Sequence, residues 1–357
     1  MRFVRWLAAM SVPLLVGVAA APAAAVPPGA PVPDLPVDNV AGYTLVIERL
    51  SPTSPRPPRG TGPAGPTRAD IDGDGIDEIV IGSSGVVFVD YSGLRRTDLL
   101  RPNVSTGGTH GFGETLAAGD FNGDGYDDLA VGNPNDDSLR WSRTPKAFPT
   151  IRIAIAGSVW IVPGGPAGLR VDLASHLTQD TPGSPSVASS GEYFGWTLAA
   201  GDINGDGRAD LAVHTLDEEV GGAALAGAVT VFYGGAAGIT TSGALWLDQS
   251  MAAVPGTARA LNNFGTGLAI GDITGDVYAD LVVGAPNDND GISWRRDHAG
   301  TGRFAVFRGT PDGLSLTGVG DVTAWGVGLP PGGWPDPIVQ YLGTGLAIRA
   351  APRRPHR

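Results

Sequence analysis

The chain has 357 residues, a formal net charge of −12, 55 glycines, 30 prolines and no cysteine. Such an acidic chain repels nucleic acid and anionic membranes and attracts divalent cations, while the missing cysteine excludes disulfides and thiol catalysis. Because Gly and Pro are abundant and charged residues are few, we expect an all-β protein with many short strands joined by turns.

Residues 1–25 have the order of segments that is typical of a secretory signal peptide. Two arginines precede an apolar stretch that begins at Trp6, and small residues follow it up to Ala25. We expect cleavage before Val26, which would leave a secreted, extracellular protein with no stable membrane insertion. The alternative is an uncleaved anchor, because the apolar stretch is nearly long enough to span a bilayer.

Residues 26–64 are rich in Pro, Gly and Ala and are predicted to be a linker. Within it, Tyr43–Ile47 has the composition of a strand. We expect this strand to complete the outer edge of a sheet. Repeated units follow over residues 65–350, and residues 351–357 form a short basic tail.

An acidic motif of nine residues recurs four times in the repeated region. The first residues of the copies lie 50, 82 and 70 positions apart. The copies are Asp70–Glu78, Asp120–Asp128, Asp202–Asp210 and Asp272–Asp280. This self-similarity predicts a repeat architecture.

Each copy is flanked by segments that look like short strands. A Phe-Gly segment precedes three copies, and an apolar run follows every copy, as in Leu129–Gly132. A third segment, such as Ser158–Val162, and a weaker fourth, such as Gly243–Asp248, complete each unit. Four strands in units of this length predict the blades of a β-propeller. A β-sandwich of the same hairpins is the alternative, but it does not explain why the acidic loop sits between the first and second strands.

The acidic motif has the donor pattern of a calcium loop. Side-chain oxygens occupy positions 1, 3, 5 and 9, glycine at position 6 permits a sharp turn, and the carbonyl of position 7 can complete the shell of a hard cation. We therefore expect up to four structural Ca²⁺ ions. The predicted ligands are Asp70, Asp72, Asp74, Ile76 and Glu78; Asp120, Asn122, Asp124, Tyr126 and Asp128; Asp202, Asn204, Asp206, Arg208 and Asp210; and Asp272, Thr274, Asp276, Tyr278 and Asp280.

The motif also resembles two other kinds of loop. An EF-hand loop ends in Glu at position 12, but that position holds an apolar residue in every copy, so an EF-hand is excluded. Asp and Gly also form ordinary β-turns, which explains one such loop but not four in register. Without a bidentate twelfth ligand, the sites are expected to be weak, with Kd on the order of 10⁻⁴ to 10⁻³ M.

The fourth loop is predicted to bind most weakly. It has neutral Thr274 at position 3 and Val277 where the other loops have glycine. If this loop keeps the shared shape, Val277 is strained by roughly 1 kcal/mol or more.

The Phe-Gly start, the Gly-Asp-x-Asn-Gly-Asp-Gly loop and Val283–Pro286 resemble the FG-GAP repeat of integrin α-subunit propellers and of many secreted bacterial proteins. The resemblance covers about residues 65–350. It implies a calcium-binding β-propeller of four-stranded blades that serves adhesion or ligand binding. Integrin members of the family close a ring of seven blades, whereas four loops occur here, so closure within one chain is left open.

Near its end the chain begins a fifth repeat. Gln340–Ile348 nearly copies Asn263–Ile270, but Arg349 and Ala350 stand where Gly-Asp should recur. We expect a truncated or frame-shifted product, with a four-blade module and a short basic tail as the alternative.

No catalytic motif is evident. The five histidines are expected to be surface groups or satisfied core groups, and the pair Glu218-Glu219 is expected to be a solvated loop. Candidate ligand loops are the polar insertions Asn135–Trp141 and Asn287–Trp294, whereas Trp160 and Trp246 are expected in the core. The leading prediction is a secreted, non-enzymatic propeller with a protein or glycan ligand; a carbohydrate-active enzyme, or an accessory domain of one, is the alternative.

Overall fold

The computed structural model describes residues 44–50, 69–83, 85–91, 96–103, 111–141, 150–288 and 302–323. The expected signal peptide, most of the linker, the partial fifth repeat and the basic tail lie outside these ranges. The described residues form strands and turns, with one short 3₁₀ helix, η1 (Val171–Leu173). None of their helices is long and apolar enough to cross a membrane.

Sixteen of the strands form four antiparallel sheets of four strands each. In order across each sheet, the first contains β1 (Thr44–Leu50), β4 (Arg96–Asn103), β3 (Val86–Tyr91) and β2 (Ile79–Ser83), and the second contains β10 (Ser175–Leu177), β9 (Ser158–Val162), β6 (Asp128–Asn133) and β5 (Thr115–Gly119). The third contains β11 (Phe194–Gly201), β12 (Asp210–Thr215), β13 (Ala228–Tyr233) and β14 (Thr240–Leu247), and the fourth contains β15 (Gly267–Gly271), β16 (Asp280–Ala285), β17 (Arg303–Phe307) and β20 (Gly320–Thr323).

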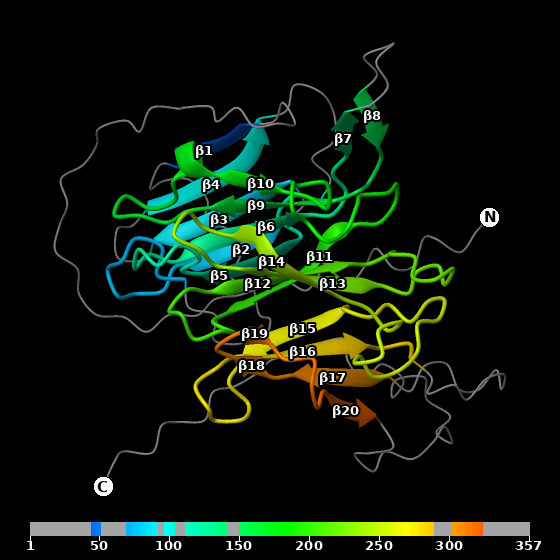
Figure 1. Ribbon diagram of the computed structural model, residues 1–357. Helices are drawn as coiled ribbons and strands as arrows, with labels where there is room; N and C mark the ends of the chain where they lie inside the picture. Colours follow the sequence, from blue (N-terminus) through cyan, green and yellow to red (C-terminus); the bar gives the residue numbers. More distant parts are fainter. Residues whose placement is uncertain are drawn as a thin grey trace, which may run out of the picture.

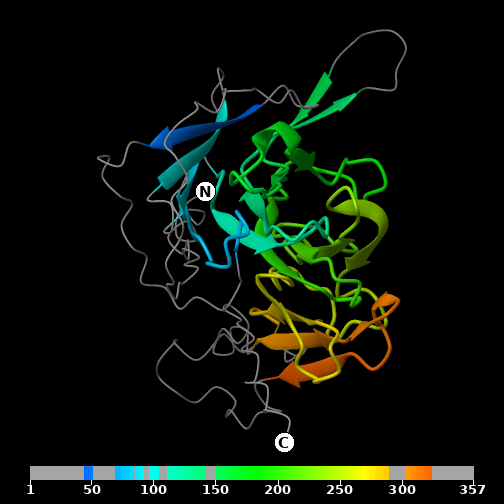
Figure 2. The same cartoon turned by 90° about the vertical axis from the view of Figure 1, so that its left-hand side faces the viewer.

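The four sheets follow one another in chain order (Figure 1), and a view turned by 90° shows them along a curve (Figure 2). Two smaller ribbons accompany them: β7 (Ser138–Trp141) pairs with β8 (Thr150–Ile153), and β18 (Gly309–Thr310) pairs with β19 (Gly313–Leu314). The expected all-β propeller of four-stranded blades is therefore confirmed, and each sheet is called a blade below.

The apolar cores lie between consecutive blades because strand residues alternate between two faces. In β6, Leu129 and Val131 pack toward the first blade, while Ala130 packs toward the third. In β12, Leu211 and Val213 pack toward the second blade, and Ala212 packs toward the fourth. Both β6 and β12 are therefore buried on both faces.

The first blade differs from the expected pattern. The strand predicted at Tyr43–Ile47 is β1, and it pairs with β4 at the edge of the sheet, as expected. However, no described strand before the first acidic loop pairs with β2, the strand after it, whereas β5, β11 and β15 pair with the strands that follow the other three loops. The expectation that every loop joins a first and second strand is confirmed for the described residues of three blades only.

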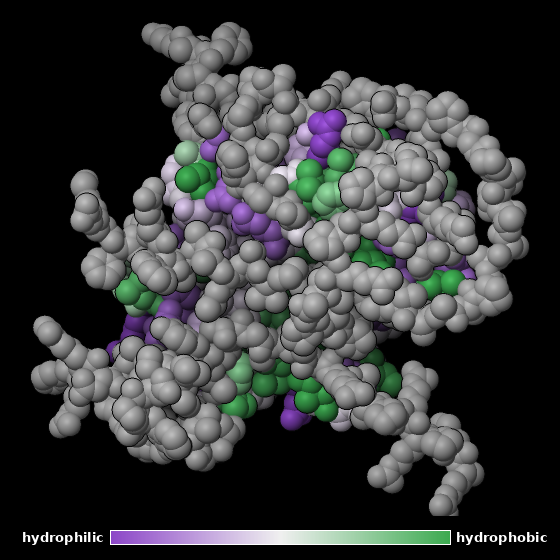
Figure 3. Space-filling view, turned by 180° about the vertical axis from the view of Figure 1, so that it is seen from behind, coloured by the Kyte–Doolittle hydropathy of each residue, from purple (hydrophilic) through white to green (hydrophobic). Residues whose placement is uncertain are grey.

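On the face seen in Figure 3, hydrophobic and hydrophilic residues of the described part are interspersed. The visible described surface there consists of small mixed patches.

Candidate functional site

All four acidic loops share one backbone conformation. The position-6 glycines Gly75, Gly125 and Gly207 have φ of 85°, 90° and 85°, and Val277 has φ of 79° at the same position. A valine in this left-handed region costs about 1–2 kcal/mol. The strain predicted for the fourth loop is confirmed.

The loops are shaped by carboxylates that accept hydrogen bonds from their own backbone. At position 1, Asp120 Oδ2 accepts from the Gly125 N–H at 2.8 Å, and the other three loops repeat this contact. At position 5, Asp124 Oδ1 accepts from the Tyr126 N–H at 3.0 Å, again as in the other loops. Short Asp side chains that bond the backbone a few residues ahead favour this kind of turn.

All four position-9 carboxylates are buried, and those of the second, third and fourth loops connect the loop to the residues after the third strand of the same blade. Asp210 is fully buried; its Oδ2 accepts from the Ile203 N–H at 2.8 Å and its Oδ1 from the Gly234 N–H at 2.9 Å. Gly234 follows β13 directly. The second and fourth loops make equivalent pairs of contacts, with Gly164 and Gly309 as the second donors.

Burial disfavours the charged form of three position-9 carboxylates, those of Glu78, Asp128 and Asp210, in the absence of a cation. It raises the pKa of Glu78 to about 8, and the nearby charge of Asp72 adds to the effect. It raises the pKa of Asp128 to about 7 and that of Asp210 to about 6, even though backbone N–H donors favour the charged form of both. A bound cation would restore the charged forms.

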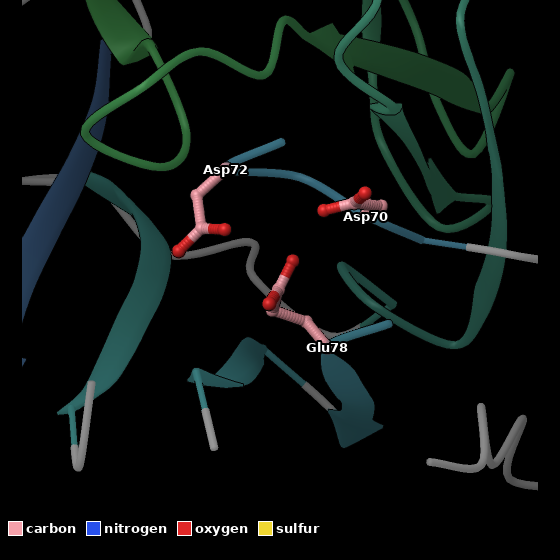
Figure 4. Close-up of side chains that lie close together, drawn as sticks. All are labelled: Asp70, Asp72 and Glu78. Carbon is pink, nitrogen blue, oxygen red and sulfur yellow. The ribbon is translucent and has the colours of Figure 1, made fainter. Parts of the chain in front are cut away.

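The first loop brings three predicted ligands together (Figure 4). Oxygens of Asp70, Asp72 and Glu78 lie within 4.8 Å of one another. Asp70 Oδ1 is buried without a hydrogen-bond partner, so one acceptor in this cluster is unsatisfied. An all-oxygen donor set with a spare buried oxygen fits a hard cation such as Ca²⁺. Asp74 lies outside the cluster and accepts from the Ile76 N–H at 2.8 Å.

In the described parts of the other three loops, no three carboxylates approach as closely. Asn122 and Asn204 instead accept from the N–H groups of Asp124 and Asp206. Thr274 contributes only its backbone N–H, which donates to Asp280 Oδ2 at 3.1 Å. The remaining predicted ligands of these loops are Asp120, Tyr126 and Asp128; Asp202, Arg208 and Asp210; and Asp272, Asp276 and Tyr278. They occupy the expected loop positions and stay predictions as ligands.

The loops also form the joints between blades, which the sequence analysis missed. The N–H of position 8 donates to the position-1 carbonyl of the preceding blade, as from Ala209 to Asp120 at 2.8 Å and from Ala279 to Asp202 at 2.9 Å. The N–H of Gly235 donates to the Phe121 carbonyl at 3.1 Å. The signal for this joint is the glycine that follows every described third strand from the second blade onward.

Side chains at position 7 cover the preceding loop. The Tyr278 ring lies so close to Gly205 that a Cβ there would be 2.7 Å from it, and Tyr126 covers Gly73 in the same way. Position 7 had been expected to contribute its carbonyl alone. The side chain of position 7 therefore also covers the position-4 glycine of the preceding blade.

Two expectations about polar groups are wrong. His214 is fully buried and neither ring nitrogen has a hydrogen-bond partner, so it is not a satisfied core histidine. Burial lowers its pKa to about 3. Glu218 is not in a solvated loop: it is partly buried, and Gln179 Nε2 donates to its Oε2 at 3.1 Å. Only its neighbour Glu219 is exposed.

The cluster of Asp136, Ser158 and His176 is not arranged for nucleophilic catalysis. Ser158 Oγ donates to Asp136 Oδ2 at 2.7 Å, and His176 Nε2 lies 3.4 Å from the same oxygen. The carboxylate thus stands between serine and histidine, whereas a nucleophilic serine needs the imidazole beside its hydroxyl.

The predicted ligand loops are described in part. Asn135–Trp141 contains β7, a strand that was not predicted, and Asn287–Trp294 is described only to residue 288. Trp160 is buried as expected, and Trp246 is partly buried, with its Nε1 donating to Asp248 Oδ2 at 2.6 Å.

Comparison with known proteins agrees with this architecture. The FG-GAP repeat family matches residues 112–162, 194–232 and 264–307, and an FG-GAP-like repeat matches residues 70–131. Phosphatidylinositol-glycan-specific phospholipase D of Bos taurus is 32% identical over 192 residues, which cover 47% of this chain and 20% of that protein. Integrin alpha-7 of Rattus norvegicus is 38% identical over 133 residues, which cover 34% of this chain and 10% of the integrin.

This chain therefore spans a fifth or less of the length of these two curated relatives. A solved structure of the rhamnogalacturonan lyase YesW covers 81% of this chain and is itself covered to 49%, with 13% identity and a TM-score of 0.33, a level of similarity that carries no functional conclusion. The repeat matches and the four-stranded blades agree in register, since each matched FG-GAP segment begins at a Phe-Gly pair and runs through an acidic loop into the third strand. The chain therefore belongs to the FG-GAP repeat proteins, and its sheets are blades of a β-propeller similar to that of integrin α chains.

Proposed function

We propose that this protein is a secreted, calcium-stabilised propeller that binds a protein or glycan ligand and has no catalytic activity of its own. The observation that carries the proposal is the place of the acidic loops, which lie in register at the joints between blades. In the first loop, the oxygens of Asp70, Asp72 and Glu78 are close enough for one cation to contact all three.

Calcium at these joints has a structural consequence. Each ion would neutralise carboxylates that burial otherwise makes unfavourable, and its binding free energy would add to the free energy of folding. A propeller held in this way presents its other loops on a rigid support, and binding residues are commonly carried by loops on such a scaffold.

The ligand-binding role is supported by the match to integrin alpha chains and by the polar insertion that follows the second strand of the second blade. The phospholipase D match keeps an enzyme-associated role as the second candidate. A glycan array tests glycan binding, a screen of extracellular proteins tests protein binding, and assays of phosphatidylinositol-glycan and polysaccharide cleavage with the same preparation test an enzymatic role. Cleavage of either substrate would contradict the non-enzymatic proposal.

Thermal unfolding in millimolar calcium and in chelator tests the metal proposal. We expect the unfolding midpoint to rise by many degrees with calcium, and Glu78→Gln to reduce that rise. Asp312→Asn is the matched control, because Asp312 is exposed and lies outside the loops. Equal midpoints with and without calcium would overturn the structural role of the ion. Secretion is tested by sequencing the N-terminus of the protein found in the culture medium, which we expect to begin at Val26.

A further inference from the structure

The ends of the blades opposite the acidic loops contain a second set of equivalent joints. The first strand of a blade runs into the acidic loop and the second runs back, so residues after the second strand lie at the opposite end. At this end, the backbone carbonyl of one acidic residue in each of three blades accepts a hydrogen bond from the backbone N–H of the glycine before the third strand. The contacts are Gly157 to Asp136 at 3.0 Å, Gly227 to Glu218 at 3.2 Å and Gly302 to Asp288 at 3.0 Å.

In two of these joints, the first residue of the third strand supplies a donor to the acid. Ser158 Oγ donates to Asp136 Oδ2 at 2.7 Å. Arg303 Nε donates to Asp288 Oδ2 at 3.0 Å, so a guanidinium meets that buried carboxylate. The equivalent residue of the third blade is Ala228, which has no polar side-chain atom. This joint therefore lacks the donor that the other two have.

A glutamine from the preceding blade completes the joint of the fourth blade. Gln249 Nε2 donates to Asp288 Oδ2 at 2.7 Å, and Gln249 Oε1 accepts from Asn262 Nδ2 at 2.7 Å. Both atoms of this amide are therefore satisfied, and the buried carboxylate has a positive charge beside it.

The joint of the third blade has the same glutamine but not the same partners. Gln179 Nε2 donates to Glu218 Oε2 at 3.1 Å. In the fourth blade, Asn262 stands two residues before Phe264, and the residue at the same place in the third blade is Glu192, two residues before Phe194. A carboxylate has no hydrogen to donate to the amide oxygen of Gln179. Gln179 is 1% exposed, and its Oε1 is buried without a partner. A buried acceptor left unpaired is unfavourable, and it is an unusual arrangement for a native interior.

Within the described part of the chain, the same joint holds two carboxylates and no cationic side chain paired with them. Glu192 is 8% exposed and accepts from the Ser189 N–H at 2.6 Å. Among the described residues, neither Glu192 nor Glu218 forms a salt bridge. Burial raises the pKa of Glu218 to about 8, and the negative charge of Glu192 adds to the effect. The side chain of Glu218 is only partly buried, which leaves a path from solvent.

We propose that Glu192, Glu218 and Gln179 Oε1 bind a hard divalent cation of the calcium type. The ion supplies positive charge to these carboxylates, as the Arg303 guanidinium does for Asp288 at the next joint. Two carboxylates and an amide carbonyl are oxygen ligands of the kind that such ions prefer, and solvent can complete the coordination shell. This site is distinct from the acidic loops, since it lies at the other end of the blades and shares no residue with them.

Ion counting by equilibrium dialysis of the whole protein with radioactive calcium tests the site. We expect Glu218→Gln to bind one ion fewer than the unaltered protein, because one carboxylate ligand is lost. Glu219→Gln is the matched control: Glu219 is the exposed neighbour, and its substitution is expected to leave the ion count unchanged. Since the acidic loops are intact in both variants, the difference reports this site whether or not the loops bind calcium.

Ala228→Arg provides a second, independent arm. Supplying a guanidinium where Arg303 stands in the next blade is expected to remove the same one ion and to raise the unfolding midpoint in chelator. If this variant does not fold, Glu218→Gln decides alone; its circular dichroism in chelator is expected to match that of the unaltered protein, because glutamine has nearly the size and shape of glutamate. An unchanged ion count in folded Glu218→Gln would overturn the proposal.

Discussion

The third and fourth acidic loops have the same backbone shape but different surroundings. Ile203, at position 2 of the third loop, is fully buried, whereas Ile273 at the same position of the fourth is 50% exposed. Gly205 lies against Tyr278 of the next blade, whereas a Cβ at Gly275 would meet no described residue within 4 Å. The loop is therefore shaped by its own hydrogen bonds, and its burial is supplied by the blade that follows.

Truncation at position 2 is expected to have the largest effect. Ile203→Ala removes a fully buried side chain from the core between the third and fourth blades and is expected to lower the free energy of unfolding by about 2–5 kcal/mol. Ile273→Ala is the matched change in the exposed loop, with an expected loss of about 0.5 kcal/mol or less. Urea unfolding measures both. Equal losses would show that the two loops do not differ in burial in solution.

A methyl group at the joint is expected to have the next largest effect. A Cβ on Gly234 would lie 2.5 Å from the Ala209 carbonyl oxygen and 2.9 Å from that of Phe121. Gly234→Ala is therefore expected to cost about 1–3 kcal/mol. Gly235→Ala is the control, since its nearest contact would be an ordinary 3.4 Å, from the Gly238 oxygen. Similar unfolding midpoints for the two variants would contradict the close packing of this joint.

In chelator, the stability of the protein is expected to depend on pH through the buried position-9 carboxylates of the loops. The pKa of Glu78 rises from its ordinary value of 4.5 to about 8, so the folded state holds a proton that the unfolded chain has lost. Stability must then fall as the pH rises from about 4.5 to about 8. The expected loss is several degrees in unfolding midpoint; Asp128 and Asp210 add changes of the same sign.

Glu78→Gln should reduce the loss in unfolding midpoint between low and high pH without abolishing it, because the other position-9 acids remain. Asp312→Asn should leave it unchanged. Midpoints measured in chelator at pH 5 and pH 8 decide the matter. A chelated protein that becomes more stable as the pH rises would contradict the uncompensated charge of Glu78.

Relief of backbone strain is expected to have the smallest effect. Val277 has φ of 79° and is 79% exposed, so Val277→Gly removes strain without loss of packing. We expect a gain of about 1 kcal/mol, reduced by the greater freedom of glycine in the unfolded chain. Val277→Ala keeps the strained φ and is expected to change stability little. A loss of stability in Val277→Gly would mean that the valine side chain makes contacts that stabilise the loop.

The blades were predictable because their information is local and repeated. The acidic loop, the apolar run after it and the glycine-bounded third strand recur in register, and each has a composition with one favoured local structure. The strained φ of Val277 could also be predicted, since a shared loop shape imposes the same turn on every copy. β7 was missed because its sequence lies in a polar insertion.

The environment of single polar residues could not be predicted, because it depends on the neighbouring blade. Glu218 stands beside Glu219, and the pair looks like a solvated turn, yet Glu218 contacts Gln179 from the preceding blade. His214 lies in a strand whose burial on both faces follows only from the stacking of blades. The candidate metal ligands were predictable in part, because the spacing of the donor residues is local, whereas the burial of Glu78 depends on the surrounding fold.

The position-8 contacts give the stack of blades a direction. Each position-8 contact between described blades uses an N–H from the later blade and a carbonyl from the earlier one, so the two ends of this row of contacts are chemically unlike. The fourth loop ends this row with the carbonyls of Asp272 and Ile273, to which no described residue donates. Such a row resembles a polymer with a plus and a minus end: it can be lengthened by identical modules, each of which must arrive in one orientation.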